Sequence, residues 1–453
     1  MNVIWIVSDT FRKDHMGCYG NKTIRTPSLD AFSARSVRFD RHYLADFPTM
    51  PARADFYTGR WTGCFMRWEP IPRGQITIPQ VLVRQGVHTA AVVDTPFYTR
   101  NLMNYDRGFR SFIEVPGQEY WMRGIGDDIR RAWRFESDRL APRTFSRAME
   151  WLEQHYKEDF FLYIDVWDPH EPWDAPSHYT QLYWPDYDGE QIDPVYGRWQ
   201  DYPGMTEEKV KKAHATYCGE LTMVDTWMGY FLRHLENLDL MGKTAIIFTT
   251  DHGFYFGEHD GLFGKLTRSR PSPVPMHLDR EIVWTISPLY EEVAACPLLI
   301  YLPEVRPGVF NGLTSAVDLM PTALDIMGKE IPAVVEGQSL LPMLQDTGTR
   351  GREFVISTHP FSNAAQVIYS VDGQPRETVG SDTTVTTDEW SLLYRPEEGN
   401  SKLYNLTSDP GQEKNVINEN VEVARELHQL LVKFMTDYNL APELREPRLE
   451  LKL

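Results

Sequence analysis

The stretch M-N-V-I-W-I-V-S-D-T at residues 1–10 decides the fold class. Its apolar run from Val3 to Val7 is continuous and rich in β-branched residues, which is typical of a central strand in a parallel sheet covered on both faces. The run ends at Ser8-Asp9-Thr10. Because ligands of open α/β sheets bind beyond the carboxyl ends of the strands, this stretch predicts a buried strand that carries polar side chains to a site.

The same arrangement recurs along the chain. Apolar runs at residues 89–93, 160–166 and 245–249 are followed by polar clusters that contain Asp94 and Thr95, Asp168 and His170, and Asp251 and His252, and a further run spans residues 298–302. Amphipathic helical patterns lie between them, at residues 26–35, 143–156 and 210–235. This alternation predicts an α/β fold in which helices sandwich a large, mostly parallel, mixed sheet.

The pattern changes after about residue 345. Short, partly alternating segments at residues 353–358, 365–369, 384–387 and 390–394 are separated by turn-rich pieces and predict a small antiparallel sheet. An amphipathic helix at residues 421–438 follows. We therefore expect an α/β catalytic domain at residues 1–345 and a smaller carboxyl-terminal subdomain at residues 346–453.

Composition limits the classes of partner. The chain has 453 residues and a net charge of −18, from 46 Lys and Arg against 64 Asp and Glu. Such an acidic chain is poorly suited to bind nucleic acid or an anionic membrane through its overall field. Four scattered cysteines indicate a reducing compartment, and we find neither a signal peptide nor an apolar run long enough to span a bilayer. We expect a cytoplasmic protein.

One motif resembles the signature of a known protein family. T-M-P-A-R at residues 49–53, followed by T-G-R at residues 58–60, resembles the sulfatase signature, in which the nucleophile precedes x-P-x-R. Further segments resemble sulfatase landmarks in the family's order: D-T-F-R-K-D-H-M-G-C-Y-G-N, T-P-S-L-D-A-F, D-P-H-E-P-W, T-T-D-H-G-F-Y-F-G-E-H, A-V-D-L-M-P-T-A-L-D-I-M-G, V-E-G-Q-S-L-L-P-M-L and L-Y-N-L-T-S-D-P-G-Q-E-K-N-V. The resemblance covers nearly the whole chain and implies the alkaline phosphatase/sulfatase fold.

The motifs assemble a candidate metal site. Asp9, Asp251 and His252 follow predicted strands and offer two carboxylates and an imidazole, and the resemblance places Thr49 as the nucleophile and a further ligand. Thr10 departs from the family, in which many relatives have a carboxylate or amide, so it is either a weak ligand or a turn hydroxyl. Imidazole beside carboxylates favours Mn²⁺, Zn²⁺ or Fe²⁺, with Ca²⁺ or Mg²⁺ as alternatives.

Other residues are assigned by the resemblance. Arg53 would orient the nucleophile, and His170 and Lys265 would bind the oxygens of the transferred group or protonate the leaving group. Thr95 and Tyr98 stand where the family has substrate-binding residues, although its usual lysine and histidine are missing there. The segment V-D-T-P-F-Y is closer to phosphonate monoester hydrolases and phosphodiesterases. His259 and His359 are lesser candidates, and Trp121, Trp167, Trp173 and the Pro-rich segment 267–284 are candidate pocket walls.

The threonine bears on the substrate. Sulfatases convert a Cys or Ser at this position to formylglycine, a route closed to Thr49, so we expect no formylglycine. A threonine hydroxyl can form a phosphothreonine intermediate, which favours cleavage of phosphodiester or phosphonate esters with one divalent metal ion. The alternatives are a sulfatase, acting through an unusual threonine route or carrying Thr49 as a variant of a Cys- or Ser-bearing parent, and a non-catalytic member. We expect a small anionic ester as substrate, and relatives leave a homo-oligomer open.

Overall fold

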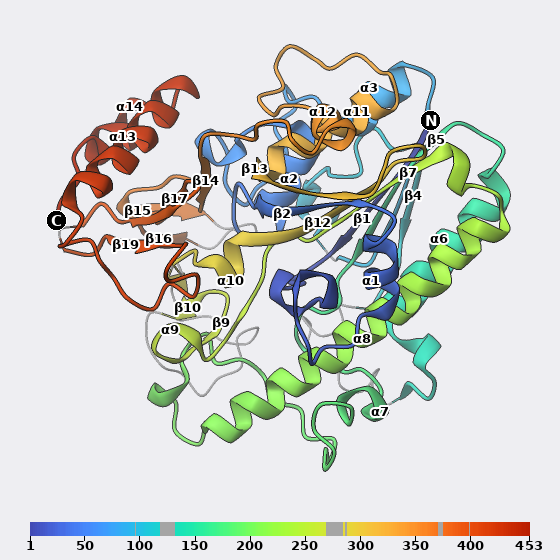
Figure 1. Ribbon diagram of the computed structural model, residues 1–453, viewed down its shortest axis with the longest axis horizontal. Coiled ribbons are helices and arrows are strands. Elements are labelled where there is room, and N and C mark those ends of the chain that lie inside the picture. The colour runs from blue at the N-terminus through green and yellow to red at the C-terminus, as the bar shows by residue number, and fades with distance from the viewer. Residues whose placement is uncertain (96, 118–131, 269–283, 286–287, 370–374, 398) are drawn as a thin grey trace.

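An eight-stranded sheet forms the centre of the protein (Figure 1). The computed structural model describes residues 1–453 except 96, 118–131, 269–283, 286–287, 370–374 and 398. The strands lie in the order β13-β2-β12-β7-β1-β5-β3-β4. Their bounds are β1 Asn2–Ser8, β2 Val37–Tyr43, β3 His88–Val93, β4 Ser111–Glu114, β5 Phe160–Val166, β7 Thr244–Thr249, β12 Ala295–Tyr301 and β13 Gly308–Ser315.

The pairing brings several strand ends to one edge. β1 runs parallel to both β5 and β7, so that Val7 lies between Asp165 and Thr249. β3 is parallel to β5 and β4, β13 is parallel to β2, and β12 is antiparallel to both of its neighbours. The predicted mixed, mostly parallel sheet is confirmed. The polar residues that follow β1, β3, β5 and β7 therefore lie at the same edge.

Both faces of the sheet are buried, as the continuous apolar run of β1 predicts. Val3, Trp5 and Val7 join the core on one face, which is covered by α2, α3, α11 and α12. Ile4 and Ile6 join the core on the other face, which is covered by α1, α6 and α8. The helices are α1 Pro27–Ser33, α2 Thr49–Thr58, α3 Ile78–Arg84, α6 Leu140–His155, α8 Glu207–Asn237, α11 Leu319–Ile326 and α12 Leu341–Gln345.

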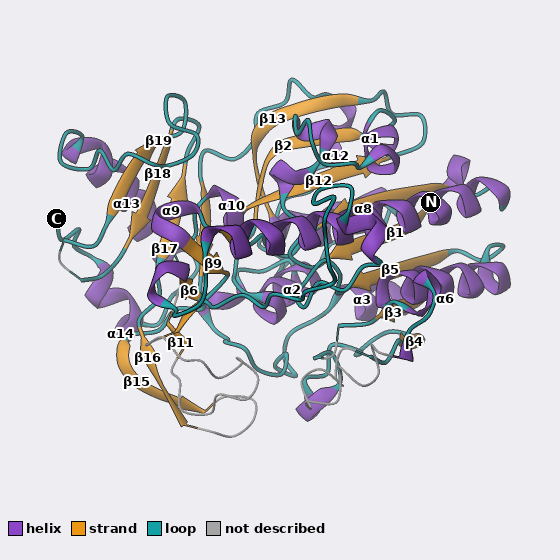
Figure 2. Cartoon of the chain, turned by 90° about the horizontal axis from the view of Figure 1, so that it is seen from below, coloured by secondary structure: helices purple, strands orange, loops and turns teal. Residues whose placement is uncertain are grey.

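A second sheet lies at the carboxyl-terminal end of the molecule (Figure 2). Its order is β14-β17-β18-β19, and all three pairings are antiparallel, as predicted, but the predicted strand at residues 365–369 lies in a separate two-stranded sheet. The elements are β14 Val355–Thr358, β17 Thr383–Thr386, β18 Trp390–Tyr394 and β19 Lys402–Asn405, with the separate hairpin of β15 Ala364–Tyr369 and β16 Pro375–Val379 and the helices α13 Val421–Asp437 and α14 Pro442–Arg445. The domain boundary at residue 345 stays a prediction.

The two sheets are joined at the segment that precedes Thr49. The Thr358 amide donates to the Ala45 carbonyl at 2.8 Å, and the Phe47 amide donates to the Thr358 carbonyl at 2.8 Å. Ser357 Oγ donates to the Leu44 carbonyl at 2.8 Å. The end of β14 therefore fixes the backbone that leads into α2.

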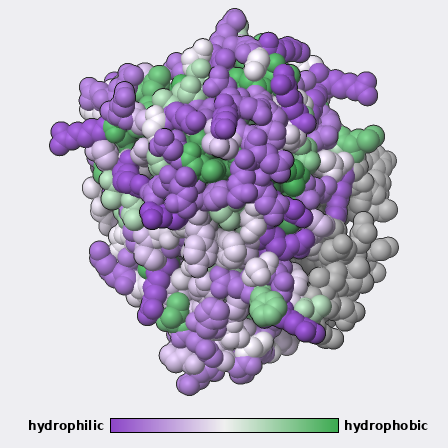
Figure 3. All heavy atoms as spheres, turned by 90° about the vertical axis from the view of Figure 1, so that its right-hand side faces the viewer, coloured by the Kyte–Doolittle hydropathy of each residue, from purple (hydrophilic) through white to green (hydrophobic). Residues whose placement is uncertain are grey.

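In addition to several short 3-10 helices, smaller elements connect these helices and strands. They are α7 Ser177–Thr180, α9 Glu258–Gly261, α10 Glu291–Ala294, a three-stranded sheet of β6 Gly197–Arg198, β9 Leu262–Gly264 and β8 Tyr255–Phe256, and the pair β10 Thr267–Arg268 and β11 Trp284–Thr285. The rest of the Pro-rich segment, like Trp121, falls outside the described residues. Within those residues no helix is both long and apolar enough to cross a membrane. The face in Figure 3 is mostly polar, with apolar residues in small separate groups.

Candidate metal-dependent active site

Three predicted metal ligands meet at the edge of the sheet. Asp9 follows β1, Asp251 and His252 follow β7, and one ligand atom from each lies within 4.8 Å of the other two. All three side chains are fully buried. The parallel pairing of β1 with β7 is what brings residues more than 240 positions apart into one cluster. Two carboxylates and an imidazole at this spacing form a set of ligands suited to a divalent cation.

Thr49 presents its hydroxyl to this cluster from the first position of α2. Its Oγ1 lies 3.5 Å from Nε2 of His252, and the side chain is 2% exposed. Pro51 is tolerated in this first turn because its missing N–H has no partner within the helix. The amino-terminal end of a helix favours negative charge, so an anion at Thr49 would be stabilised by the helix as well.

Arg53, one turn further along α2, joins the carboxylates together. Its Nη1 donates to Asp251 Oδ2 at 2.5 Å, and its Nη2 lies 3.0 Å from Asp9 Oδ2. Its Nε and Nη2 donate to the two oxygens of Asp165 at 2.8 and 2.7 Å. Nη1 also donates to the Thr49 carbonyl at 3.0 Å. Arg53 thus holds the backbone of Thr49 against the candidate metal ligands.

Asp165 was not anticipated from the sequence. It points from β5 into the site, is fully buried, and accepts bidentate hydrogen bonds from Arg53. Its signal was an acid inside the apolar run F-F-L-Y-I-D-V at residues 160–166. A buried carboxylate in such a run requires a cationic partner. Arg53, the arginine of the signature, is the candidate for that partner in the sequence.

Thr95 and Tyr98 face this same carboxylate. Thr95 Oγ1 donates to Asp165 Oδ1 at 2.7 Å, and the Tyr98 hydroxyl donates to Asp165 Oδ2 at 2.5 Å. Neither residue is exposed. In this arrangement both hydroxyls are directed to Asp165, and their expected role in binding substrate stays a prediction.

The carboxylates carry an electrostatic conflict that a cation would relieve. Burial, and then the charge of Asp251, raise the pKa of Asp9 well above its usual range despite Arg53 and Lys265. Burial would also raise the pKa of Asp251, but His252 and Arg53 lower it below its usual value. Among the described residues, neither oxygen of Asp9 receives a well-directed hydrogen bond. A divalent ion fits this unsatisfied carboxylate, and Asp9, Asp251, His252 and Thr49 would hold it.

Thr10 has an unusual backbone. Its φ is +54°, a region that a β-branched residue rarely adopts, and its amide donates to Asp251 Oδ1 at 3.1 Å. Its Oγ1 is buried and has no hydrogen-bond partner in the part of the chain described. The strained backbone serves to orient Asp251, and whether the hydroxyl is a weak ligand stays a prediction.

The histidines are held in defined orientations. A backbone carbonyl can only accept, so Nδ1 of His252 donates to Gly253 at 3.0 Å and Nε2 presents its lone pair towards Thr49. Burial, only partly offset by Asp251, lowers the pKa of His252 to about 4. Nδ1 of His170 donates to the Glu171 carbonyl at 2.6 Å, and its ring stacks on Trp167 at 3.8 Å. Both rings are therefore neutral, with the proton on Nδ1 and the lone pair on Nε2.

Lys265 belongs to the same environment. It is 5% exposed, and its Nζ has no hydrogen-bond partner among the residues described. Burial lowers the pKa of His170, and the charge of Lys265 lowers it further. The same charge lowers the pKa values of Asp9 and Asp251. A buried ammonium without a partner is costly, and an anionic substrate would supply the missing acceptor.

Other motif residues have structural contacts. Gly59, at φ +61°, ends α2, and its carbonyl accepts from the Glu336 and Gly337 amides. Arg60 pairs with Glu336 at 2.7 Å, so the T-G-R half of the signature anchors α2 to the V-E-G segment. His259 pairs with Glu292 at 2.8 Å, His359 packs against Phe47, and Trp173 lies in the core against Phe254.

Metal binding is expected to stabilise the fold. Adding Mn²⁺ to chelator-treated protein at 100 times its dissociation constant should raise the free energy of unfolding by about 2.7 kcal/mol. Thermal unfolding followed by circular dichroism measures the shift. Asp9→Asn should abolish it, whereas Asp159→Asn, at the exposed opposite end of β5, should not. An equal Mn²⁺ shift in the Asp9→Asn protein would contradict the ligand set.

Glu171 predicts a pH dependence of stability. Burial raises its pKa to about 7, against an ordinary value near 4.5. The folded state then keeps a proton that the unfolded state loses, so this contribution is complete below pH 4.5 and disappears as the pH rises through about 7. Glu171→Gln should remove this part of the slope in urea unfolding between pH 5 and about 7. The exposed Glu150→Gln is the control, and an unchanged slope in Glu171→Gln would refute the assignment.

Comparison with known proteins identifies sequences similar to nearly the whole chain. A sequence profile described as Sulfatase matches residues 1–329, and one described as N-sulphoglucosamine sulphohydrolase, C-terminal, matches residues 286–437. An arylsulfatase of Clostridium perfringens is 25% identical, with 95% of this chain and 94% of that protein aligned. An N-acetylglucosamine-6-O-sulfatase of Bacteroides thetaiotaomicron is 22% identical, covering 96% and 86%.

Solved structures show the same fold. The phosphonate monoester hydrolase of Agrobacterium radiobacter superposes with a TM-score of 0.74 at 18% identity, covering 96% of both chains. The phosphonate monoester hydrolase of Silicibacter pomeroyi gives 0.74 at 21% identity, covering 96% of this chain and 95% of that one. The resemblance of the signature and the expected sulfatase-type α/β fold are confirmed.

Proposed function

The chain belongs to the sulfatase family of ester hydrolases, and we propose that it uses Thr49 as a nucleophile to cleave phosphodiester or phosphonate esters. The observation that carries the proposal is the position of the Thr49 hydroxyl, 3.5 Å from His252 Nε2, beside the carboxylates that Arg53 holds together. Enzymes of the family use a divalent metal ion. For this chain we propose Mn²⁺, Zn²⁺ or Fe²⁺, which would activate the hydroxyl and neutralise charge on the substrate.

The residues of the chain divide the reaction into two steps. In the first, the Thr49 hydroxyl loses its proton to solvent, Oγ1 forms a bond to phosphorus, the bond to the leaving oxygen breaks, and Lys265 or a protonated His170 donates a proton to that oxygen. In the second, water forms a bond to phosphorus, the bond between phosphorus and Oγ1 breaks, and a proton from that water returns to Oγ1. Arg53 keeps Thr49 in place throughout. Because His170 is neutral before substrate binds, it would take up its proton as the anion arrives.

A sulfuric ester hydrolase is the second candidate. The curated relatives named arylsulfatase and N-acetylglucosamine-6-O-sulfatase favour it. Against it stands the chemistry of residue 49, because a threonine side chain cannot be matured to the aldehyde that releases sulfate by elimination. Sulfatase action would require direct displacement at sulfur and then hydrolysis of a threonine sulfate, which is the harder route.

Substrate preference is tested with aryl esters of one leaving group. With Mn²⁺ present, the protein should hydrolyse an aryl phosphodiester or aryl phosphonate faster than the aryl sulfate, and mass spectrometry of quenched reactions should locate a phosphoryl or phosphonyl group on Thr49. A preference for aryl sulfate would refute the proposal and support the second candidate. Absence of turnover on all three esters would support a non-catalytic member.

Residue 49 can be tested in both directions. Thr49→Cys, expressed with a formylglycine-generating enzyme, creates the C-x-P-x-R form of the signature, and we expect aryl sulfate hydrolysis to appear with the aldehyde. Thr49→Ser expressed without such an enzyme is the control, and it should keep the phosphodiester preference. No gain by the aldehyde-bearing protein would show that the pocket itself excludes sulfate esters.

Substitution of Thr95 tests whether its hydroxyl positions Asp165 or binds substrate. If its hydroxyl serves to hold Asp165, Thr95→Val should lower stability by about 1 kcal/mol, as for one buried hydrogen bond, and reduce kcat with little change in KM. A raised KM with unchanged kcat would instead support the expected contact with substrate. Steady-state kinetics and urea unfolding distinguish the two.

A further inference from the structure

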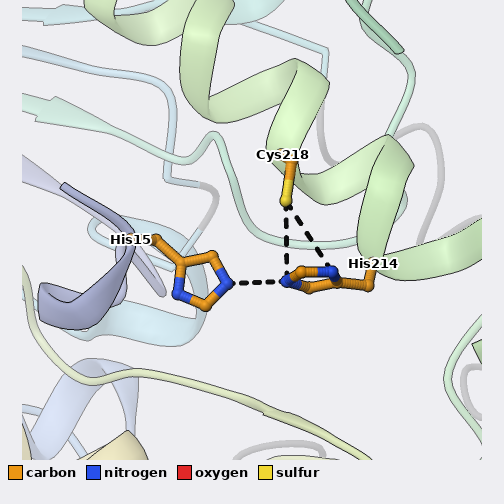
Figure 4. Close-up of side chains that lie close together, drawn as sticks. All are labelled: His15, His214 and Cys218. Atoms are coloured by element: carbon orange, nitrogen blue, oxygen red, sulfur yellow. Dashed lines mark hydrogen bonds between the residues drawn. The ribbon is translucent and has the colours of Figure 1, made fainter. Parts of the chain in front are cut away.

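A second cluster of metal-binding side chains lies outside the proposed active site (Figure 4). His15 comes from a short 3-10 helix at Lys13–His15, and His214 and Cys218 lie one turn apart on α8. One ligand atom from each lies within 4.8 Å of the others. We propose that His15, His214 and Cys218 bind a zinc ion, with water as the fourth ligand.

The spacing fits tetrahedral zinc after a small adjustment. Zinc–nitrogen bonds of ~2.05 Å and zinc–sulfur bonds of ~2.3 Å place two nitrogens ~3.3 Å apart and nitrogen and sulfur ~3.6 Å apart. His214 Nε2 lies 3.5 Å from Cys218 Sγ, close to that value. His15 Nε2 lies 2.7 Å from His214 Nε2, so the two rings must separate by roughly 0.6 Å. Figure 4 shows the two Nε2 atoms facing each other and the sulfur above the His214 ring, 3.5 Å from its Nε2 and 3.9 Å from its Nδ1, so the Cys218 side chain must also turn towards the ion.

The surroundings orient the first ligand for a cation. Asp14 Oδ1 lies 2.8 Å from His15 Nδ1, and Arg12 pairs with the same carboxylate, which keeps Asp14 ionised. A carboxylate accepts only, so Nδ1 of His15 carries the proton and Nε2 presents its lone pair to the cluster. A carboxylate behind a histidine ligand is the usual arrangement in zinc sites.

The remaining features also suit zinc. Cys218 is 1% exposed, and burial raises the pKa of its thiol, so the ion would have to displace that proton for the thiolate to bind. His214 is only partly buried, so part of its side chain is in contact with solvent. Two imidazoles and a thiolate favour zinc over Mn²⁺, Ca²⁺ or Mg²⁺, which prefer oxygen ligands.

The position gives the ion a structural effect. His15 lies just beyond Asp9 and Thr10, and Tyr217, next to Cys218, donates from its hydroxyl to the Thr10 carbonyl at 2.7 Å. A zinc ion here would clamp the loop after β1 to α8. The cluster is distinct from the ligands of the active site, because it shares no residue with Asp9, Asp251 and His252.

The test measures metal binding, not activity. Chelator-treated protein loaded with Co²⁺ should show thiolate-to-cobalt charge-transfer absorption, because Cys218 supplies the only thiolate in this cluster. Cys218→Ser should lose that absorption. Cys18→Ser, which alters a thiol outside the cluster, and Asp9→Asn, which disables the proposed active-site metal, should both retain it.

Zinc stoichiometry gives the second measurement. Equilibrium dialysis followed by mass spectrometry of the metal should show one equivalent fewer in His214→Ala and in His214→Gln than in wild type, while His234→Ala on the same helix should match wild type. Circular dichroism without metal checks that each variant is folded. Wild-type protein that lacks the charge-transfer band, or folded His214→Gln that binds as much zinc as wild type, would overturn the proposal.

Discussion

Thr49→Val is expected to lower kcat for aryl phosphodiester hydrolysis by roughly 10⁶-fold, because removal of the catalytic nucleophile lowers kcat by about that factor in a serine hydrolase. Valine keeps the branched shape at the first position of α2, so the backbone and its contact with Arg53 should persist. The loss should appear in kcat with little change in the melting temperature. Stopped assays at saturating substrate, with Mn²⁺ present, measure it.

Two substitutions bracket this result. Thr49→Ser keeps a hydroxyl and should retain turnover within about tenfold of wild type, since nucleophile and geometry are preserved. Thr58→Val is the matched control on the same helix, because Thr58 is equally buried and its Oγ1 bonds only to the Ala54 carbonyl in the described structure. Full turnover by the Thr49→Val protein would eliminate the mechanism.

The strand ends of the site were predictable because they depend on local pattern. Continuous apolar runs predicted β1, β3, β5, β7 and β12, and parallel strands necessarily bring their carboxyl ends to one edge. Asp9, Asp251 and His252 followed from that rule and from the family resemblance. Thr49 was placed by its motif alone, and the structure brings it within 3.5 Å of His252.

The parts of the fold that the sequence did not predict depend on long-range contacts. β2, at Val37–Tyr43, alternates polar and apolar residues and carries Arg38, Asp40 and Arg41, so no continuous run marked it as part of the large sheet. The contact of β14 with the segment before Thr49 joins residues more than 300 positions apart. Such pairings are set by tertiary packing, and local sequence periodicity does not report them.

Thr95 and Tyr98 show that the role inferred from a residue's place in the family's motif can differ from the contacts it makes in the structure. Both stand at the end of β3, where the motif predicts contact with substrate, but the acid in the neighbouring strand accepts both hydroxyls. A buried carboxylate is satisfied by every donor within reach. To predict the role of Asp165 from the sequence, one would have had to pair this buried acid with the buried Arg53 without knowing the order of the strands.

Substitution of Asp165 is expected to have the second large effect, on stability. Asp165→Asn should lower the free energy of unfolding by about 3–5 kcal/mol, because loss of one partner leaves the buried guanidinium of Arg53 without its bidentate acceptor. Turnover should fall as well, since Arg53 holds the Thr49 carbonyl and Asp251. Urea unfolding of chelator-treated protein measures the stability change.

Asp94→Asn is the matched control, and it separates lost charge from lost hydrogen bonds. Asp94 is equally buried at the end of the adjacent strand, and burial, with the charge of Asp168, raises its pKa well above the usual range. Because its pKa is raised, a neutral amide is a closer replacement for this carboxyl, and Asp94→Asn should cost less than about 1.5 kcal/mol. If Asp165→Asn were no more destabilising than Asp94→Asn, Arg53 would not depend on Asp165 for its charge. The orientation of the proposed nucleophile would then rest on Asp9 and Asp251 alone.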